Sequence, residues 1–339
     1  MKKRLIALSA VLALPVAACS GPAAEEAAGE QGDGSSLTVV LANTSCVLNF
    51  PVYSALAEGF FEEEGLDLQV EAVNGSSAVL QAMLAGQADF GGPGAVPVMA
   101  AQARGEDVVY FMNASPGGSF FLIAPEDSGI TGPEDLAGKT VGVATADGNE
   151  VVFVDVIMDG AGVGEDGFEK LTVGEGGQAV AAFERGDIDA YAASSDGFAT
   201  IENAGFSLLD ITPPDVDYMF GNGYAAPRDL IDSEPEALEA FGKGFYRAVQ
   251  WAEENPDQAI DNCAEYQPQE VEDRDYATRL LEISALTRVS PYPEDPWGSM
   301  RAEDWEAMLQ DAVDAGHVEE GQVDVDQVYT NDLVDGFQP

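Results

Sequence analysis

The sequence predicts an α/β protein whose main part folds as two lobes. Short β-branched runs alternate with amphipathic stretches from Leu37 onward, a pattern typical of βα units around mostly parallel sheets. At residues 86–89 a glycine that ends a predicted helix is followed, three residues later, by an aspartate that leads into a strand, and the same pattern occurs at 186–189. This repeat of a glycine-bounded unit indicates two lobes built on one plan. Roughly 300 residues follow the N-terminal region, enough for two domains of ordinary size.

The first lobe opens with a strand and a helix that starts at Pro51 and ends before Gly65. Proline suits the first turn of a helix, and glycine commonly follows its end. The expected elements, in order, are a strand at 37–42, a helix at 51–64, a strand at 66–73, a helix at 76–85, a brief strand at 88–91, a helix at 94–104 and a strand at 108–112.

The second lobe is expected at 125–220, and the chain then returns to the first lobe. Its predicted elements are a helical turn and buried strand at 133–143, a helix at 149–158 and strands near 171, 188 and 208. Helical patterns dominate afterwards, at 234–254, 256–266, 273–287 and 302–315. These helices are expected to pack on the first lobe, so lobe I comprises 37–124 and 221–339. The crossings are predicted near 122–125 and 218–224.

The N-terminus is typical of an export signal. Lys2, Lys3 and Arg4 precede an apolar run at 5–16 that is too short for a stable transmembrane helix. Residues 16–19, Val-Ala-Ala-Cys, resemble the lipobox of bacterial lipoproteins, in which the cysteine is acylated after the preceding peptide is removed. The prediction is a signal peptide at 1–18, a lipid on Cys19 and a flexible tether at 19–36, with an ordinary cleaved signal as the alternative.

Composition excludes some partners. The chain has 14 basic and 61 acidic residues and a formal charge of -47, so it repels nucleic acid and anionic lipid and suits a high-salt habitat. Lipid at Cys19 is the one membrane contact expected, at the extracytoplasmic face, on the cell surface or in a periplasm. The other two cysteines, Cys46 and Cys263, form either a disulfide or two separate buried thiols.

Several ordered motifs resemble one family. They are the runs at 53–68, 75–77, 84–91, 133–143, 183–189 and 328–333. Together they are similar to the NMT1/THI5-like substrate-binding proteins, which include importer components for thiamine-precursor pyrimidines, alkanesulfonates, taurine and nitrate. The resemblance implies a type II periplasmic-binding-protein fold, with a ligand cleft between two α/β lobes and two crossover segments. It also implies a monomer that binds a small-molecule solute and works with an ABC permease.

The expected ligand site lies beyond the carboxyl ends of the strands, where helix starts offer free N–H groups. The candidate loops are 43–53, 75–77, 92–95 and 145–149. For Ser76, Asp147 and Ser195 the alternative is a role as helix N-caps. The candidate ligand-binding residues are Asn43, Ser45, Phe50, Tyr53, Gly75, Ser76, Ser77, Gly94, Ala95, Ser119, Asp147, Asn149, Ser195, Asp196, Tyr218 and Asn222.

The chemistry of these residues favours a neutral or cationic solute, for example a heterocycle such as a thiamine-precursor pyrimidine. Asp147 and Asp196 suit an amine, and aromatic rings suit a planar ligand. Arg104 and Lys139 are the nearest expected cations, at the far ends of neighbouring elements. The alternative is an alkanesulfonate, taurine or nitrate, which backbone N–H groups alone can hold.

Catalysis is not expected. THI5 enzymes of the resembling family use their own Lys and His to make the thiamine pyrimidine, whereas this chain has one His, His317, predicted to lie outside the cleft. Residues 19–138 contain no Lys, and there is no G-x-S-x-G elbow. A THI5-like pyrimidine synthase is therefore the disfavoured alternative. No cofactor is expected and no metal site, because the acidic pair at 324 and 326 lacks the rest of a calcium loop.

Overall fold

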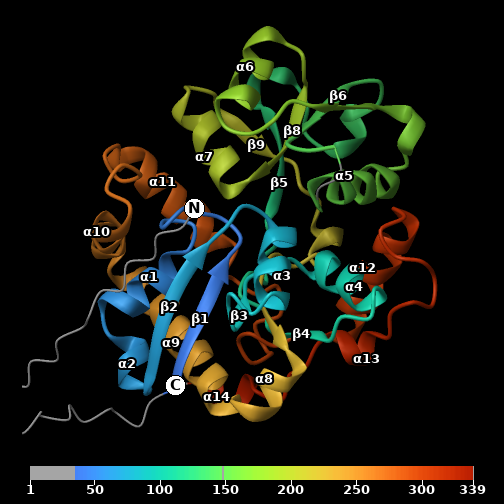
Figure 1. Ribbon diagram of the computed structural model, residues 1–339. Helices are drawn as coiled ribbons and strands as arrows, with labels where there is room; N and C mark the ends of the chain where they lie inside the picture. Colours follow the sequence, from blue (N-terminus) through green and yellow to red (C-terminus); the bar gives the residue numbers. More distant parts are fainter. Residues whose placement is uncertain (1–34, 147–148, 339) are drawn as a thin grey trace, which may run out of the picture. The chain divides into compact units, whose positions relative to one another are not determined.

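The computed structural model describes residues 35–146 and 149–338 (Figure 1). The predicted signal peptide, Cys19 and residues 19–34 of the predicted tether lie outside this part of the chain, and so does Asp147. The predicted tether ends too late, because Ser35 and Ser36 already form the start of the first strand. Within the described residues, no helix combines the length and the apolar character that crossing a membrane requires.

The first sheet has five strands in the order β2-β1-β3-β10-β4. The strands β1 and β2 run parallel through seven paired residues, and β1 also pairs in parallel with β3. The late strand β10 inserts antiparallel between β3 and β4. The bounds are β1 Ser35–Leu41, β2 Leu66–Ala72, β3 Phe90–Gly91, β4 Val108–Met112 and β10 Tyr224–Pro227.

The second sheet also has five strands, in the order β7-β6-β8-β5-β9. The strand β5, Phe120–Pro125, pairs antiparallel with both β8 and β9. The predicted boundary between lobes at 124/125 is therefore too late, and the first crossing precedes Phe120. The remaining strands are β6 Thr140–Val143, β7 Glu169–Thr172, β8 Ala190–Ser194 and β9 Leu208–Asp210, followed by the second crossing before β10.

The helices cover both sheets, and those after Tyr224 return to the first sheet or to the helices packed on it. Helix α9 contacts α1 and β2, and α12 and α13 contact α4. The first lobe carries α1 Phe50–Ala57, α2 Phe60–Glu63, α3 Ser76–Leu84, α4 Ala95–Ala103, α8 Arg228–Ser233, α9 Pro235–Glu254, α10 Pro256–Tyr266, α11 Arg274–Leu286, α12 Ala302–Asp314, α13 Val325–Val328 and α14 Val334–Phe337. The second carries α5 Asn149–Gly160, α6 Gly177–Arg185, α7 Ser195–Asn203 and short 3₁₀ turns at Glu126–Ser128, Pro133–Leu136, Glu165–Gly167 and Pro214–Val216.

The repeated glycine-bounded unit has the same geometry in both sheets. Asp89 accepts a hydrogen bond from the Thr38 backbone N–H at 2.7 Å, and its own N–H donates to the Thr38 carbonyl at 2.9 Å. Asp189 makes the same pair with Thr140, at 3.0 and 2.8 Å. In each lobe the aspartate thus fixes the register at which the strand after the helix joins its parallel neighbour.

One predicted helix is two helices. The stretch expected as a helix at 51–64 is interrupted at Gly59, whose φ of +77° places it in the left-handed region that favours glycine. The break lets α2 turn and pack Phe61 against Phe241 of α9, with stacked rings 5.4 Å apart. The main core lies here, between α9 and the first sheet, where Phe90 and Tyr224 also contact Phe241.

Candidate functional site

Three neighbouring cavities, which share lining residues, lie between the lobes. We call them the outer cleft, of about 1280 Å³, the inner pocket, of about 190 Å³, and the side pocket, of about 390 Å³. Phe120 and Asn222 line all three. Phe120 begins β5 directly after the first crossing, and Asn222 lies in the second crossing, so the cavities meet where the chain passes between lobes.

The wall of the outer cleft in the second lobe is acidic. Glu150, Glu175 and Asp196 all line it. Burial, and then the charges of Asp196 and Glu150, raise the pKa of Glu175 above its ordinary value. Three carboxylates this close favour a ligand group that donates hydrogen bonds or carries positive charge.

Hydrogen bonds hold two of these carboxylates in place. Glu150, in the first turn of α5, accepts from the backbone N–H of Thr145 at 2.8 Å and from its hydroxyl at 2.6 Å. Asp196 accepts from the hydroxyl of Tyr276 at 2.5 Å. Because Asp196 belongs to α7 and Tyr276 to α11, this bond joins the two lobes at one end of the cleft.

The opposite wall carries the loop at 43–49, which is held by its own side chains. Asn43 accepts from the Ser45 backbone N–H at 3.1 Å and from the Asn49 side chain at 2.8 Å. Glu270 accepts from the Ser45 hydroxyl and, at 2.8 Å, from the Cys46 backbone N–H. Polar groups of this loop are therefore fixed before a ligand arrives.

A disulfide ties the same loop to α10. Cys46 and Cys263 are bonded, with their Cα atoms 5.5 Å apart. The structure thus decides between the two alternatives that the sequence left open, in favour of the disulfide. The bond closes a loop with a sequence separation of 217 and links a cleft loop to a helix far along the chain.

The floor of the inner pocket carries a cation, Arg288, which follows α11. Its guanidinium donates to the carbonyls of Ala114 at 2.6 Å and Leu48 at 3.0 Å, and to the Ser115 hydroxyl at 2.5 Å. All of these partners are neutral, so the charge is not balanced by them. Burial lowers the pKa of Arg288 to about 10, which leaves it protonated at neutral pH.

Most of the predicted ligand-binding residues line one of the three cavities. Asn43, Ser45, Gly75, Ser76, Ser77, Asn149, Asp196 and Asn222 line the outer cleft. Asn43, Ser119, Ser195 and Asn222 line the inner pocket. Gly94, Ala95, Ser119, Asn149 and Asn222 line the side pocket.

The N-cap alternative is wrong for the two serines that the structure describes. Ser76 is the first residue of α3 after the N-cap Gly75, and its hydroxyl accepts from the Gly94 backbone N–H at 3.0 Å. In α7 the cap is Ser194, which accepts from the Gly197 N–H at 3.1 Å, and Ser195 comes one residue later. Ser76 therefore links two loops of the cleft rather than capping its own helix.

Three predicted residues belong to the packing of the lobes instead. Phe50 and Tyr53 are 2% and 7% exposed and face the core from α1, where the Tyr53 ring lies 4.9 Å from that of Tyr266. Tyr218 packs beside the core of the first lobe and donates its hydroxyl to Asp311 at 2.8 Å. An aromatic at the start of a helix faces either the core or the cleft, and the sequence alone does not say which.

The sequence missed two side chains that line these cavities, Arg288 and His317. The sequence named Arg104 and Lys139 as the nearest cations, at the far ends of neighbouring elements. Arg104 lines the outer cleft itself, and Arg288, which was not expected near the site, lines the inner pocket. His317 also lines the outer cleft, as an exposed residue, so its predicted place outside the cleft is wrong. Arg288 and His317 are distant in sequence from the other cleft loops, and no local motif marks them.

A metal centre receives no support from the described residues, because no three or more of their His, Cys, Asp and Glu side chains lie where they could hold an ion together. The acids of the outer cleft are engaged with hydroxyl and backbone donors, as in the bonds of Glu150, Asp196 and Glu270.

Comparisons with known proteins agree with this architecture. The formylaminopyrimidine-binding protein of Halalkalibacterium halodurans is 24% identical over 277 residues, which cover 76% of this chain and 78% of the relative. The riboflavin-binding protein RibY of Chloroflexus aurantiacus is 24% identical over 356 residues, 99% of each. The structure of the periplasmic aliphatic sulphonate binding protein SsuA from Escherichia coli matches with a TM-score of 0.67 at 17% identity, over 86% of this chain and 91% of that one.

The match to solved structures shows the two-lobe type II periplasmic-binding-protein fold that the sequence predicts. The model of the family described as NMT1/THI5 like matches residues 49–259. This range begins in the fixed loop of the first lobe and ends in α10, so it includes both crossings. The chain belongs to the NMT1/THI5-like family.

Proposed function

We propose that this chain is the extracytoplasmic solute-binding component of an ABC importer and holds one small molecule between its lobes. The observation that carries the proposal is the set of cavities lined from both lobes and meeting at Phe120 and Asn222. Two-lobed proteins of this kind close on a ligand through backbone changes in a few residues of the crossing segments. The names of the relatives as binding proteins support the same function.

The favoured solute is a small heterocycle that carries an amino group. Glu150, Glu175 and Asp196 offer acceptors to an amine on one wall of the outer cleft. Arg288, on the floor of the inner pocket, suits an acceptor such as a ring nitrogen or a carbonyl oxygen. The ring of Phe120 lies where the cavities meet and offers a face for stacking. A thiamine-precursor pyrimidine has all three features.

An alkanesulfonate, taurine or nitrate is the second candidate, and Arg288 is the observation that favours it. An anion in the inner pocket would balance a buried guanidinium whose present partners are neutral. The acidic wall of the outer cleft opposes this choice, because it would repel any anion on its way to the inner pocket.

The proposal is binding without turnover. Among the described residues that line the three cavities there is no Lys, and His317 is exposed on the wall of the outer cleft. A protein that only binds returns its solute unchanged, and this is measured by mass spectrometry of the solute after incubation. The lipid anchor at Cys19, the permease partner and the monomeric state belong to the same proposal.

Calorimetry with named solutes decides between the candidates. The panel is 4-amino-5-aminomethyl-2-methylpyrimidine, taurine, n-butanesulfonate and nitrate. If the amine lies on the acidic wall, Glu175→Gln weakens pyrimidine binding about 10- to 100-fold, the value of one charge-assisted hydrogen bond. Glu254→Gln, an exposed residue at the end of α9, is the matched control and leaves the affinity unchanged.

Arg288→Lys tests whether the bound solute, of either class, reaches the floor of the inner pocket. Lysine keeps the charge but cannot reproduce the guanidinium's three hydrogen bonds, so it weakens binding of any solute that uses this floor. Sulfonate or nitrate binding with no measurable pyrimidine binding would reject the heterocycle. Conversion of any solute during incubation would reject binding without turnover.

A further inference from the structure

The side pocket differs from the other two cavities because its walls are mainly apolar. Val152 and Phe153 of α5 line it from the second lobe, and Met308 of α12 lines it from the first. Met219 and Phe220 of the second crossing complete the wall. The pocket is therefore made by both lobes and by the segment that joins them.

Two exposed apolar side chains stand at the edge of this pocket. Leu286 is 59% exposed and Val289 is 60% exposed, and both line the pocket. Both side chains add apolar surface to the lining of this pocket, in a chain whose formal charge is -47. The apolar lining of the side pocket therefore extends to side chains that are exposed to solvent.

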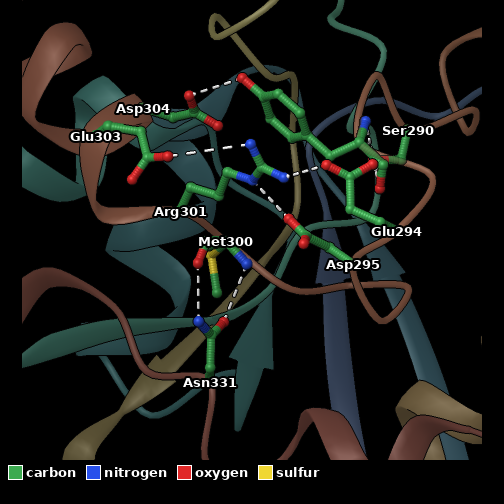
Figure 2. Close-up of polar contacts among 9 residues, drawn as sticks. Ser290, Glu294, Asp295, Met300, Arg301, Glu303, Asp304 and Asn331 are labelled. Atoms are coloured by element: carbon green, nitrogen blue, oxygen red, sulfur yellow. Dashed lines mark hydrogen bonds and ion pairs between the residues drawn. The ribbon is translucent and has the colours of Figure 1, made fainter.

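A network of polar side chains, from residues 290–304, holds the segment that follows Val289 (Figure 2). Arg301 lies with its guanidinium 3.7 Å from the centre of the Tyr292 ring and pairs with Asp295 at 2.5 Å and with Glu294 at 2.8 Å. Tyr292 donates its hydroxyl to Asp304 of α12 at 2.9 Å. The edge of the side pocket is thus held in place without a ligand.

The side pocket and the outer cleft share two amide side chains in their linings. Asn149 and Asn222 line both cavities. They meet at Gly94, where an added Cβ would lie 2.8 Å from the Asn149 amide nitrogen and 3.3 Å from the Asn222 amide oxygen. The polar lining of the outer cleft and the apolar lining of the side pocket are therefore adjacent at these amides.

We propose that the side pocket is an apolar subsite that takes an alkyl or aryl part of the solute whose polar part lies in the cleft. This inference rests on the proposed function and makes the solute amphiphilic. A dry cavity of about 150 Å³ already admits benzene, so about 390 Å³ is ample for an aryl group or a short alkyl chain. Each methylene buried there tightens the dissociation constant about three- to fourfold.

A neutral apolar probe tests the subsite directly. N-phenyl-1-naphthylamine is titrated into the full chain, and its fluorescence rises as it enters an apolar site. Val289→Asp and Leu286→Gln each weaken its binding about fivefold or more, because each places a polar group at the edge of the pocket. Leu209→Asp is the matched control, since Leu209 is also exposed, at 37%, but lies on β9 outside the three cavities.

The two proposals fail in different ways. If Val289→Asp and Leu286→Gln leave probe binding unchanged while melting temperatures stay normal, the apolar subsite is overturned, whichever polar solute the cleft accepts. Failure of every polar solute in the calorimetric panel instead counts against the proposed function. A series of n-alkylamines from one to eight carbons, whose ammonium group suits the acidic wall of the outer cleft, gives the second readout. Affinity rises with chain length in the wild type and rises less in Val289→Asp. A series that binds with no gain from added length in the wild type also overturns the subsite.

Discussion

The disulfide between Cys46 and Cys263 should contribute much of the stability of this protein. Replacing both cysteines by alanine removes a cross-link across a sequence separation of 217. The chain-entropy relation for a loop of this length gives about 5 kcal/mol at 25 °C, through the greater freedom of the unfolded chain. For a protein of this size the loss lowers the melting temperature by about 8 °C.

Urea unfolding of the wild type, with and without reductant, and of the double variant measures this effect. We expect the reduced wild type and the double variant to lose similar stability, and reductant to leave the double variant unchanged. Both sulfur atoms lie in buried residues, so the small cavities left by alanine add little difference between the two forms. A loss below about 1 kcal/mol in the double variant would refute the entropic reasoning.

Two further predictions concern the cleft and the sheet beside it. Because the pKa of Glu175 is raised in the folded protein, its protonated form stabilises the wild type in acid, and this stability is lost as pH rises through the raised pKa. Glu175→Gln abolishes the loss, so urea unfolding between about pH 4 and 7 would contradict the reasoning if both proteins showed the same dependence of stability on pH. Gly223→Ala places a Cβ 2.2 Å from the Met112 carbonyl oxygen and destabilises the protein by about 1–3 kcal/mol. In the control, Gly92→Ala, the atom nearest to the new Cβ is 3.5 Å away and stability changes little, so equal melting curves for the two variants would show the reasoning to be wrong.

The order of helices and strands could be read from the sequence because the signals are local. Hydrophobic periodicity and glycine at helix ends depend on neighbouring residues, and the units at Asp89 and Asp189 repeat in sequence as they do in space. The break at Gly59 and the strands β5 and β10 were missed. A glycine in a helical pattern is compatible with both a continuous and a broken helix, and strand membership depends on partners far along the chain.

The sequence by itself determined the α/β class, the two-lobe plan and most of the loops that line the cavities. Only the tertiary structure decided that Phe50 and Tyr53 face the core, that Arg288 lies on the floor of the inner pocket and that Cys46 and Cys263 form a disulfide. Each of these facts depends on which surfaces meet after folding. Arg288 reaches its partners Leu48 and Ala114 across most of the chain, and no pattern within a helix or loop encodes a contact of that range.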